Sequence, residues 1–456
     1  MWWHRSRGSH EGGAVRRSRA GRWWAVALAT AAALVLLAVV TLWHAAGGLQ
    51  GPGVAATGTA AALQPVSHVQ DTGTVQRGEY LARLGNCMGC HTAAGGAAFA
   101  GGRGIETPFG TVYAPNLTPD IGTGLGRWTA DDFWGAMHHG KSRDGRLLYP
   151  AFPYPSYTYV TRQDADDLFG YLRSLPAVEQ ANRPHTLRFP FSTPLALAAW
   201  RALYFRPQAW AADAARPPEW NRGAYLVQGL GHCAACHAPR NSWGATVDAA
   251  GLRGGMMPVQ NWLAPSLAAP EEAGVSDWPV DEIVSLLQTG QTPRATVSGP
   301  MAEVVFGSTQ YLRAEDARAM AVYLQSLPVQ AGRHPQEVPA PHAAVMERGR
   351  AVYASRCAQC HGDAGQGRDG HFPALAGNRA VNLHNPANLV RMVLEGGYAP
   401  ATTGNPWPAG MPPFNQVLGD EDIAAVLSYV RNAWGNRAAA LGAIDVYRVR
   451  ERRAPG

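Results

Sequence analysis

The sequence leaves no cysteine free for a disulfide framework. Only six cysteines occur among 456 residues, and all of them lie in three Cys-x-x-Cys pairs. A histidine directly follows each pair, which gives the sets Cys87, Cys90 and His91; Cys233, Cys236 and His237; and Cys357, Cys360 and His361. One repeated motif therefore uses every cysteine, and a small disulfide-stapled fold is excluded.

Other signals are also absent. No glycine-rich dinucleotide loop follows a strand, and Gly122-Thr123-Gly124 is better explained as a turn. No strand-like alternation of any length is present, so we expect an all-α fold with long loops. The chain offers no substrate-oxidising machinery of its own, and no catalytic residue is assigned.

A basic face on the folded body is missing as well. The net charge is +6, but the first 22 residues carry +5 and the last nine carry +3. The remaining body is therefore slightly acidic, at −2. Nucleic-acid binding, which needs a basic surface on the body, is not expected.

The N-terminal region contains the one apolar run long enough to span a bilayer. Residues 23–43 are uncharged and mostly apolar, and six arginines precede them. A helix of about 20 residues matches the hydrocarbon thickness, and arginine-rich flanks stay in the cytoplasm. We predict an uncleaved anchor in the bacterial cytoplasmic membrane with the body on the periplasmic side. A signal peptide cleaved near Ala45-Ala46-Gly47 is the alternative.

The surroundings of the three motifs repeat. An Arg-Gly pair precedes each motif, at Arg77-Gly78, Arg222-Gly223 and Arg348-Gly349. Amphipathic helices with apolar residues at intervals of three and four are expected after the motifs, over 164–174, 314–326 and 420–433. A tyrosine holds the matching place in each of them, at Tyr171, Tyr323 and Tyr429. The repeats indicate three copies of one structural unit.

The motif itself is the signature of covalently attached haem c. Two thiols spaced three apart on a helical turn reach the two vinyl groups of one porphyrin, and the following imidazole faces the iron. The other imidazole nitrogen needs an acceptor, and the candidates are the carbonyls of Pro115, Pro265 and Pro373. A zinc half-site or a redox dithiol is the competing explanation of one Cys-x-x-Cys pair. Three copies behind an export segment favour three haem groups.

A sixth iron ligand separates electron carriers from reactive haems. Met301 lies 64 residues after His237, and Met411 lies 50 residues after His361. Both stand in proline-containing loops before a closing helix, so we predict that both bind iron, while Met256-Met257 is the rival pair. Methionine with histidine fills the coordination sphere and raises the potential.

These predictions divide the chain into nine parts. They are a basic cytoplasmic N-terminus (1–22), a transmembrane anchor (23–43), a flexible linker (44–74), three tandem class I cytochrome c-type domains (75–176, 220–328 and 344–436), a linker with an amphipathic segment (177–219), a second linker (329–343) and a basic C-terminal tail (437–456). The aromatic-rich segment 189–210 is expected either at a membrane or partner surface or packed between domains.

Residues 75–434 resemble the membrane-bound triheme cytochrome c subunits of bacterial alcohol, gluconate, sorbitol and aldehyde dehydrogenases. The resemblance rests on four motifs, which are TVYAPNLTPD at 111–120, LYPAFPY at 148–154, GPMAEVV at 299–305 and GMPPF at 410–414. It implies an electron-transfer subunit in a membrane complex. A partner dehydrogenase with pyrroloquinoline quinone, a flavin or a molybdenum cofactor would supply electrons, and membrane quinone or an oxidase would receive them.

One position departs from the family pattern. Phe152 stands where the family commonly has methionine, so the first haem needs another ligand or has none. Met137, His138 and His139 are the candidates within reach. An open first haem in a peroxidase-like enzyme, or a haem subunit of a terminal oxidase, are the alternative functions.

Overall fold

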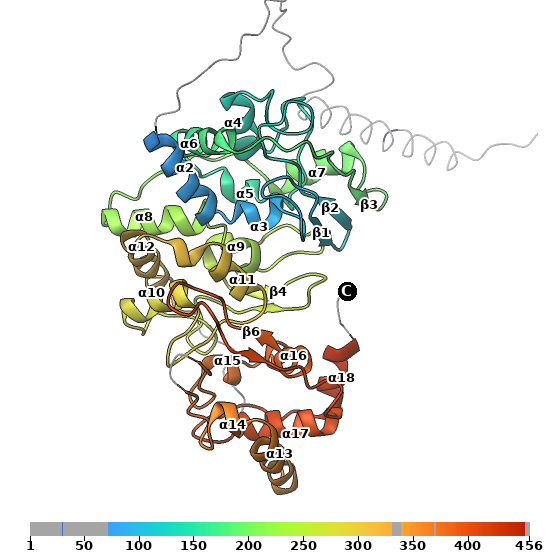
Figure 1. Cartoon of the computed structure of the whole chain (residues 1–456), viewed down its shortest axis with the longest axis vertical. Helices are drawn as coiled ribbons and strands as arrows, with labels where there is room; N and C mark the ends of the chain where they lie inside the picture. The colour runs from blue at the N-terminus through green and yellow to red at the C-terminus, as the bar shows by residue number, and fades with distance from the viewer. Residues whose placement is uncertain (1–29, 31–71, 331–338, 369–370, 452–456) are drawn as a thin grey trace, which may run out of the picture.

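The computed structural model describes residue 30 and residues 72–330, 339–368 and 371–451. Three stretches follow one another along an elongated molecule (Figure 1), and we call them unit one (72–176), unit two (218–328) and unit three (343–451). The molecule is mostly helical, and long irregular loops connect short helices.

Each unit contains the same succession of elements, a leading helix, a motif helix and a closing helix. Unit one and the segment after it consist of α2 (Thr72–Leu84), α3 (Cys87–His91), β1 (Gly104–Thr107), β2 (Gly110–Tyr113), α4 (Ala130–His139), α5 (Tyr154–Tyr157), α6 (Arg162–Ser174), β3 (Thr186–Leu187) and α7 (Pro194–Tyr204). Unit two consists of α8 (Pro218–Gln228), α9 (Ala234–His237), η1 (Ala249–Gly251), β4 (Gly255–Met256), β5 (Leu263–Ala264), α10 (Val280–Thr289), α11 (Pro300–Gly307), η2 (Thr309–Tyr311) and α12 (Ala314–Gln325). Unit three consists of α13 (Ala343–Arg356), α14 (Ala358–His361), α15 (Arg379–Asn382), α16 (Ala387–Glu395), β6 (Gly397–Tyr398), β7 (Gly410–Met411), α17 (Asp420–Val430) and α18 (Ala443–Glu451).

Local side chains determine where the helices of unit one begin. The hydroxyl of Thr129 accepts the backbone N–H of Asp132, and the Asp132 carboxylate accepts the N–H of Thr129. This reciprocal pair satisfies two of the N–H groups that a helix start leaves free. Thr161 caps α6 in one direction only, because its hydroxyl accepts the N–H of Asp164.

The repeated Arg-Gly pair makes a close crossing between the leading and closing helices. A Cβ atom on Gly78 would lie 2.0 Å from the carbonyl oxygen of Asp167 in α6. The corresponding distances are 1.9 Å from Gly223 to Ala319 in α12 and 2.2 Å from Gly349 to Ala425 in α17. Only glycine allows the backbones to approach this closely. The repeat in the sequence is therefore a helix-crossing motif.

The arginine next to each of these glycines forms an ion pair between the two crossing helices. The Nε atom of Arg77 lies 2.9 Å from the Asp167 carboxylate, and that of Arg222 lies 2.7 Å from Asp316. In unit three, Arg348 pairs with Glu421 and Asp422, both at 2.7 Å. Asp167 and Asp316 are buried, at 1% and 4% exposure. In two of the three crossings the carboxylate is buried, although its arginine side chain stays 40–50% exposed, so removing the arginine would leave a buried charge without its partner.

Units one and two form one body. A single hydrophobic core runs from Leu81 and Leu168 in unit one to Leu226 and Ile283 in unit two. Asp316 joins them further, because its carboxylate accepts the Tyr80 hydroxyl at 2.6 Å as well as the Arg222 guanidinium. Burial alone would raise the pKa of Asp316, but these hydrogen bonds outweigh it and the pKa is lowered.

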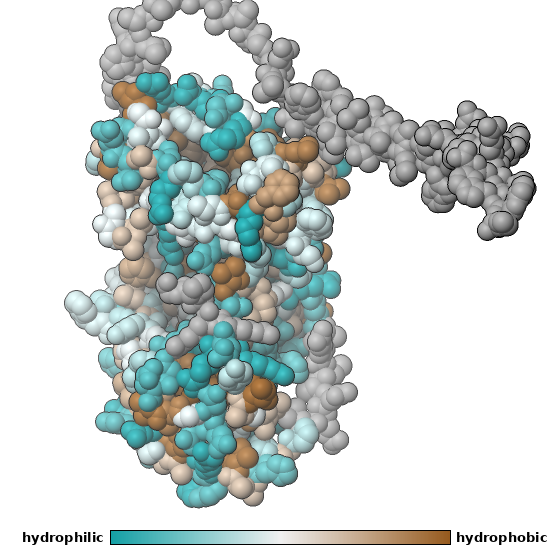
Figure 2. Space-filling model, turned by 90° about the vertical axis from the view of Figure 1, so that its right-hand side faces the viewer, coloured by the Kyte–Doolittle hydropathy of each residue, from teal (hydrophilic) through white to brown (hydrophobic). Residues whose placement is uncertain are grey.

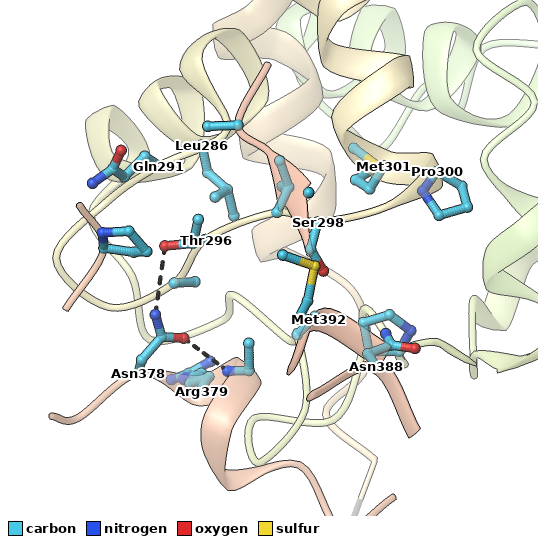
Figure 3. Close-up of a pocket in the computed structure, with 18 of the residues that line it drawn as sticks. Leu286, Gln291, Thr296, Ser298, Pro300, Met301, Asn378, Arg379, Asn388 and Met392 are labelled. Carbon is cyan, nitrogen blue, oxygen red and sulfur yellow. Dashed lines mark hydrogen bonds between the residues drawn. The ribbon is translucent and has the colours of Figure 1, made fainter. Parts of the chain in front are cut away.

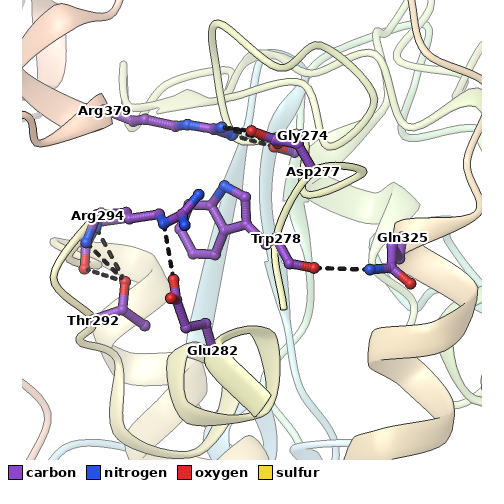
Figure 4. Close-up of polar contacts among 9 residues, drawn as sticks. Gly274, Asp277, Trp278, Glu282, Thr292, Arg294, Gln325 and Arg379 are labelled. Carbon is purple, nitrogen blue, oxygen red and sulfur yellow. Dashed lines mark hydrogen bonds and ion pairs between the residues drawn. The ribbon is translucent and has the colours of Figure 1, made fainter. Parts of the chain in front are cut away.

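Unit three has its own core and joins unit two through polar contacts. Ile423 and Val390 lie at the centre of that core. Arg379 of α15 reaches back to the carboxylate of Asp277 at 3.0 Å and to the carbonyl of Gly274 (Figure 4). Its guanidinium carbon lies 5.0 Å from the ring centre of Trp278. This cluster holds the third unit against the second.

Several elements differ from the sequence-based expectations. A small three-stranded antiparallel sheet, with the order β1-β2-β3, joins unit one to the segment after it. Within the segment expected to be a basic tail, α18 buries Val446 completely, and Arg450 pairs with Asp420 at 2.6 Å. The sequence did not predict these elements, because strands of two to four residues and a helix held in place by distant contacts show little periodicity.

The described ranges contain no helix that is both long and apolar enough to cross a membrane. The predicted anchor over residues 23–43 lies outside those ranges, apart from Thr30. The basic N-terminus lies outside them too, as does the first linker except for its last three residues, which begin α2.

Candidate functional site

Each motif histidine is held by the proline carbonyl that the sequence predicted. The Nδ1 atom lies 2.8 Å from the carbonyl oxygen of Pro115 for His91 and 2.8 Å from that of Pro265 for His237. For His361 the distance to Pro373 is 2.9 Å. Since a carbonyl only accepts, Nδ1 carries the proton and Nε2 keeps its lone pair. This is the tautomer that a metal-binding imidazole requires.

The motif side chains are poor candidates for other cysteine or histidine chemistry. Burial lowers the pKa of His91, against the opposing bond to Pro115, so the imidazole stays neutral. Burial raises the pKa of Cys87 and of Cys233 to about 12. A redox dithiol needs a lowered thiol pKa, so the redox-dithiol explanation loses support. Among the described residues, no cluster of three or more His, Cys, Asp or Glu side chains could hold a metal ion.

The motifs of units two and three open into one continuous cavity of about 480 Å³. Its walls include Cys236 and His237 on one side and Cys360 and His361 on the other. Figure 3 shows part of this cavity, with side chains from unit two facing side chains from unit three. Leucine, valine and proline make up much of the lining. The structure thus brings two predicted attachment sites together in one mostly apolar space.

Met301 lines this cavity at the start of α11, as its proposed role requires. The two alternative ligands from the sequence, Met256 and Met257, have different surroundings. Met257 also lines the cavity, whereas Met256 is 42% exposed and its sulfur accepts a hydrogen bond from Asn385 at 3.6 Å. Met301, Met257 and Met320 of α12 are therefore the three unit-two methionines that line the cavity.

Met411 lines the cavity in unit three, where β7 pairs with β6 and fixes its backbone. A second sulfur was missed from the sequence. Met392 of α16 also lines the cavity, as Figure 3 shows. Its position on an apolar helix face resembles that of an ordinary core residue, so the sequence gave no separate signal for it.

A buried hydrogen-bond donor without a partner among the described residues, the Trp278 indole N–H, indicates that haem fits this cavity. Trp278 is 2% exposed and lines the cavity, and its indole N–H has no hydrogen-bond partner within the described part of the chain. Leaving such a group unpaired costs about 1–3 kcal/mol. A carboxylate entering the cavity would satisfy it, and haem carries two. The guanidinium carbon of Arg294 lies 5.8 Å from the same ring.

In unit one, Phe152 is half-buried and does not offer a ligand atom. Its ring lies 5.3 Å from that of Tyr157, which is 5% exposed. Burial, followed by the neighbouring thiols of Cys87 and Cys90, raises the pKa of Tyr157 far above its ordinary value. Tyr157, which the sequence analysis did not single out, therefore lies close to the thiols of the first motif.

The alternative ligands of unit one lie on α4 and have different surroundings. Met137 is buried in the core that units one and two share. The ring of His138 stacks on Trp134 at 4.4 Å, and its buried Nδ1 has no partner among the described residues. The carbonyl of His139 accepts a hydrogen bond from Arg201 at 2.7 Å. The sixth ligand of the first haem stays a prediction.

One arginine in each unit binds the motif itself, and the sequence analysis missed all three. Arg103 donates to the carbonyl of Gly89, which directly precedes Cys90. Arg240 and Arg368 donate to the equivalent carbonyls of Ala235 and Gln359, at 2.6 and 2.9 Å. They follow the motif histidine at three unequal distances in the sequence, so no fixed spacing reveals them. A positive charge thus accompanies each attachment turn.

Comparisons with known proteins agree with this geometry. The cytochrome c family model matches residues 75–176 and 346–434. The chain is 38% identical to the cytochrome c subunit of a quinone-dependent alcohol dehydrogenase from Gluconacetobacter polyoxogenes, over 87% of this chain and 88% of that protein. It is 36% identical to the gluconate 2-dehydrogenase cytochrome c subunit of Pantoea cypripedii, over 83% and 89%. It is 35% identical to the fructose dehydrogenase cytochrome subunit of Gluconobacter japonicus, over 83% and 82%.

Proposed function

Because the chain belongs to the family of dehydrogenase cytochrome c subunits, whose haem c is covalently bound, we propose that it is a three-haem electron-transfer subunit of a periplasmic dehydrogenase complex. It takes electrons from a catalytic partner and passes them to membrane quinone or an oxidase. The partner carries pyrroloquinoline quinone, a flavin or a molybdenum cofactor.

One observation carries the proposal. Three motif helices each present an imidazole whose Nδ1 is bonded to a proline carbonyl. When bound, haem supplies one-electron chemistry, and the protein positions it and tunes its potential. The cysteines would attach the group, the imidazoles would be available to its iron through Nε2, and the apolar walls would keep water away from it. No substrate-oxidising step is assigned to this chain.

Methionine sulfur completes the second and third sites in this proposal. Met301 and Met411 are the proposed ligands, and both line the shared cavity. A filled coordination sphere suits electron transfer rather than ligand chemistry. The first site takes His138 or His139 of α4 or stays open, and it then differs electronically from the other two; Met137, the third candidate, would make it equivalent to them.

The proposed architecture is three tandem class I cytochrome c-type domains behind one membrane anchor. The repeated leading, motif and closing helices support the three domains. The anchor over residues 23–43 rests on the sequence alone, through its length and the arginines before it. It would hold the haem domains on the periplasmic face of the cytoplasmic membrane, in contact with lipid.

The direct test purifies the full chain from membranes in mild detergent. A pyridine haemochrome assay should give three haems per chain, and a dehydrogenase subunit should co-purify. Fewer than three haems in matured protein would refute the haem count. A dehydrogenase that neither co-purifies nor reduces the haems when its substrate is added would refute the assignment. Salt should not release the chain, and a mature N-terminus near residue 47 would refute the anchor.

A further inference from the structure

The segment between units one and two exposes an unusual number of large apolar side chains. Phe189 is 84% exposed, and in α7 Leu203 is 74% and Leu195 49% exposed. Trp243, from a loop of unit two, adds a further side chain at 58% exposure. The ring of Phe191 lies 6.5 Å from that of Trp243, so the two segments meet. We call this set the α7 surface.

The composition of α7 is not that of a helix that faces water. Ala198 is its only buried residue, although the helix carries one charged side chain, that of Arg201, among eleven residues. A solvent-facing helix normally presents polar side chains on its outer face. Several exposed large apolar side chains on one helix and its neighbours mark an interaction site.

The α7 surface is firmly attached to the body. Arg201 donates to the carbonyl of His139, and its guanidinium lies 5.1 and 4.8 Å from the ring centres of Tyr154 and Phe205. The indole N–H of Trp200 donates to the carbonyl of Trp243 at 2.9 Å. The apolar side chains are therefore displayed on a fixed support.

The charge next to this surface has one sign. No aspartate or glutamate occurs from residue 180 to residue 212, whereas Arg183, Arg188, Arg201 and Arg206 do. No ion pair joins any of these four arginines to a carboxylate among the described residues, although Arg188 donates to the carbonyl of Pro108 and Arg201 to that of His139. Uncompensated arginines beside exposed tryptophan, tyrosine and leucine match the boundary between anionic headgroups and acyl chains.

The position of the surface favours lipid over a protein partner. The start of α2, where the chain enters the body, and α7 lie at the same end of the molecule, opposite unit three (Figure 1). Figure 2, which views the side that carries α7, shows hydrophobic residues among polar ones at this end. A flexible chain as long as residues 44–71 spans about 30 Å on average. An anchor at 23–43 would therefore keep this end close to the bilayer.

We propose that the α7 surface rests on the anionic headgroup region of the membrane, so that unit one is the unit nearest the lipid. Arginines 188 and 206 contact lipid phosphates, and Leu195, Leu203 and Phe189 enter the upper acyl region. This contact is distinct from the anchor, but it rests on the proposed membrane location.

The test places a photoreactive benzoylphenylalanine at Leu203 in the full chain. The protein is reconstituted into vesicles of phosphatidylcholine with phosphatidylglycerol, illuminated and analysed by mass spectrometry. The matched control carries the same group at Val417 of unit three, which is also exposed, at 56%. We expect at least a fivefold excess of lipid adducts at position 203. The double substitution Arg188→Gln and Arg206→Gln should reduce that excess in these vesicles but not in pure phosphatidylcholine.

Equal lipid adducts at the two positions would overturn the proposal. A cross-link from position 203 to another subunit, or to residues 31–71 of the same chain, would overturn it as well. Haem content and reduction by dithionite are measured on the same samples. Three reducible haems without a lipid adduct refute only the lipid contact, whereas an adduct on a chain without haem refutes only the electron-transfer role.

Discussion

Substituting the glycine at a helix crossing tests the architecture most directly. In Gly223→Ala, two effects oppose each other. Alanine is about 1 kcal/mol more favourable than glycine inside a helix. Its Cβ would, however, lie 1.9 Å from the carbonyl oxygen of Ala319 and 2.9 Å from the Cβ of Tyr323. The structure predicts that the clash prevails.

The size of the effect follows from the packing. The clash is with backbone, so no side-chain rotation relieves it, and α8 must move away from α12. That movement loosens Leu226 and Ala317, both fully buried. Overpacking a core costs about 1–3 kcal/mol and sometimes more. Because the contact is with backbone, the cost should fall at the upper end of that range, which leaves a net loss of about 2 kcal/mol after the gain in helix propensity.

Thermal unfolding of the haem-loaded chain, followed by far-ultraviolet circular dichroism, measures this loss. The control is Gly135→Ala in α4, where the nearest atom to an added Cβ is 3.9 Å away. That substitution should be neutral or stabilising by up to about 1 kcal/mol. If Gly223→Ala raises the melting temperature as Gly135→Ala does, the helices do not cross at this glycine and the reasoning is wrong.

Three further outcomes are expected. Replacing Met301 with alanine should lower the reduction potential of one haem and let carbon monoxide bind to it. The control Met88→Ala, at an exposed position, should do neither. An unchanged redox titration of the Met301 variant would assign the iron ligand to another sulfur. Asp316→Asn should cost about 2–4 kcal/mol because its buried charge-assisted hydrogen bonds are lost, whereas the more exposed Asp422→Asn should cost under about 1 kcal/mol. The pKa of Asp316 is lower in the folded chain than in the unfolded chain. The stability that its charge contributes is therefore complete above the unfolded-state pKa of about 4 and is lost as the pH falls through the folded-state pKa. Acid should destabilise the parent more steeply than the Asp316→Asn variant in urea titrations. Arg431→Met should cost about 3–5 kcal/mol, because the fully buried guanidinium satisfies three backbone carbonyls; a urea midpoint equal to that of the parent would contradict this.

The features that could be predicted from the sequence are those determined by residues close together in the chain and repeated in each unit. The three motifs, the proline acceptors and the closing helices follow from spacing and from the helical period. The structure has these helices at α6, α12 and α17, with ends within three residues of the predicted ones. Adjacent residues determine such features, so one-dimensional patterns contain them.

The remainder depends on contacts between distant residues. Arg103, Arg240 and Arg368 perform one task at three different sequence distances from their histidines. Met392 becomes a cavity residue only because α16 faces the third motif. The joining of two sites in one cavity is likewise a property of how units two and three pack.

The carboxylate that Tyr80 and Arg222 share has a kinetic consequence. Electron tunnelling slows exponentially with distance, so a hinge between two redox centres makes every transfer wait for a favourable approach. Asp316 bonds to a residue of each unit, and the rings of Tyr157 and His232 lie 5.7 Å apart beside the first two motifs. If haem occupies the first two motifs as proposed, this joint keeps the step between them at one fixed length, so that its rate would follow driving force rather than diffusion of one unit towards the other.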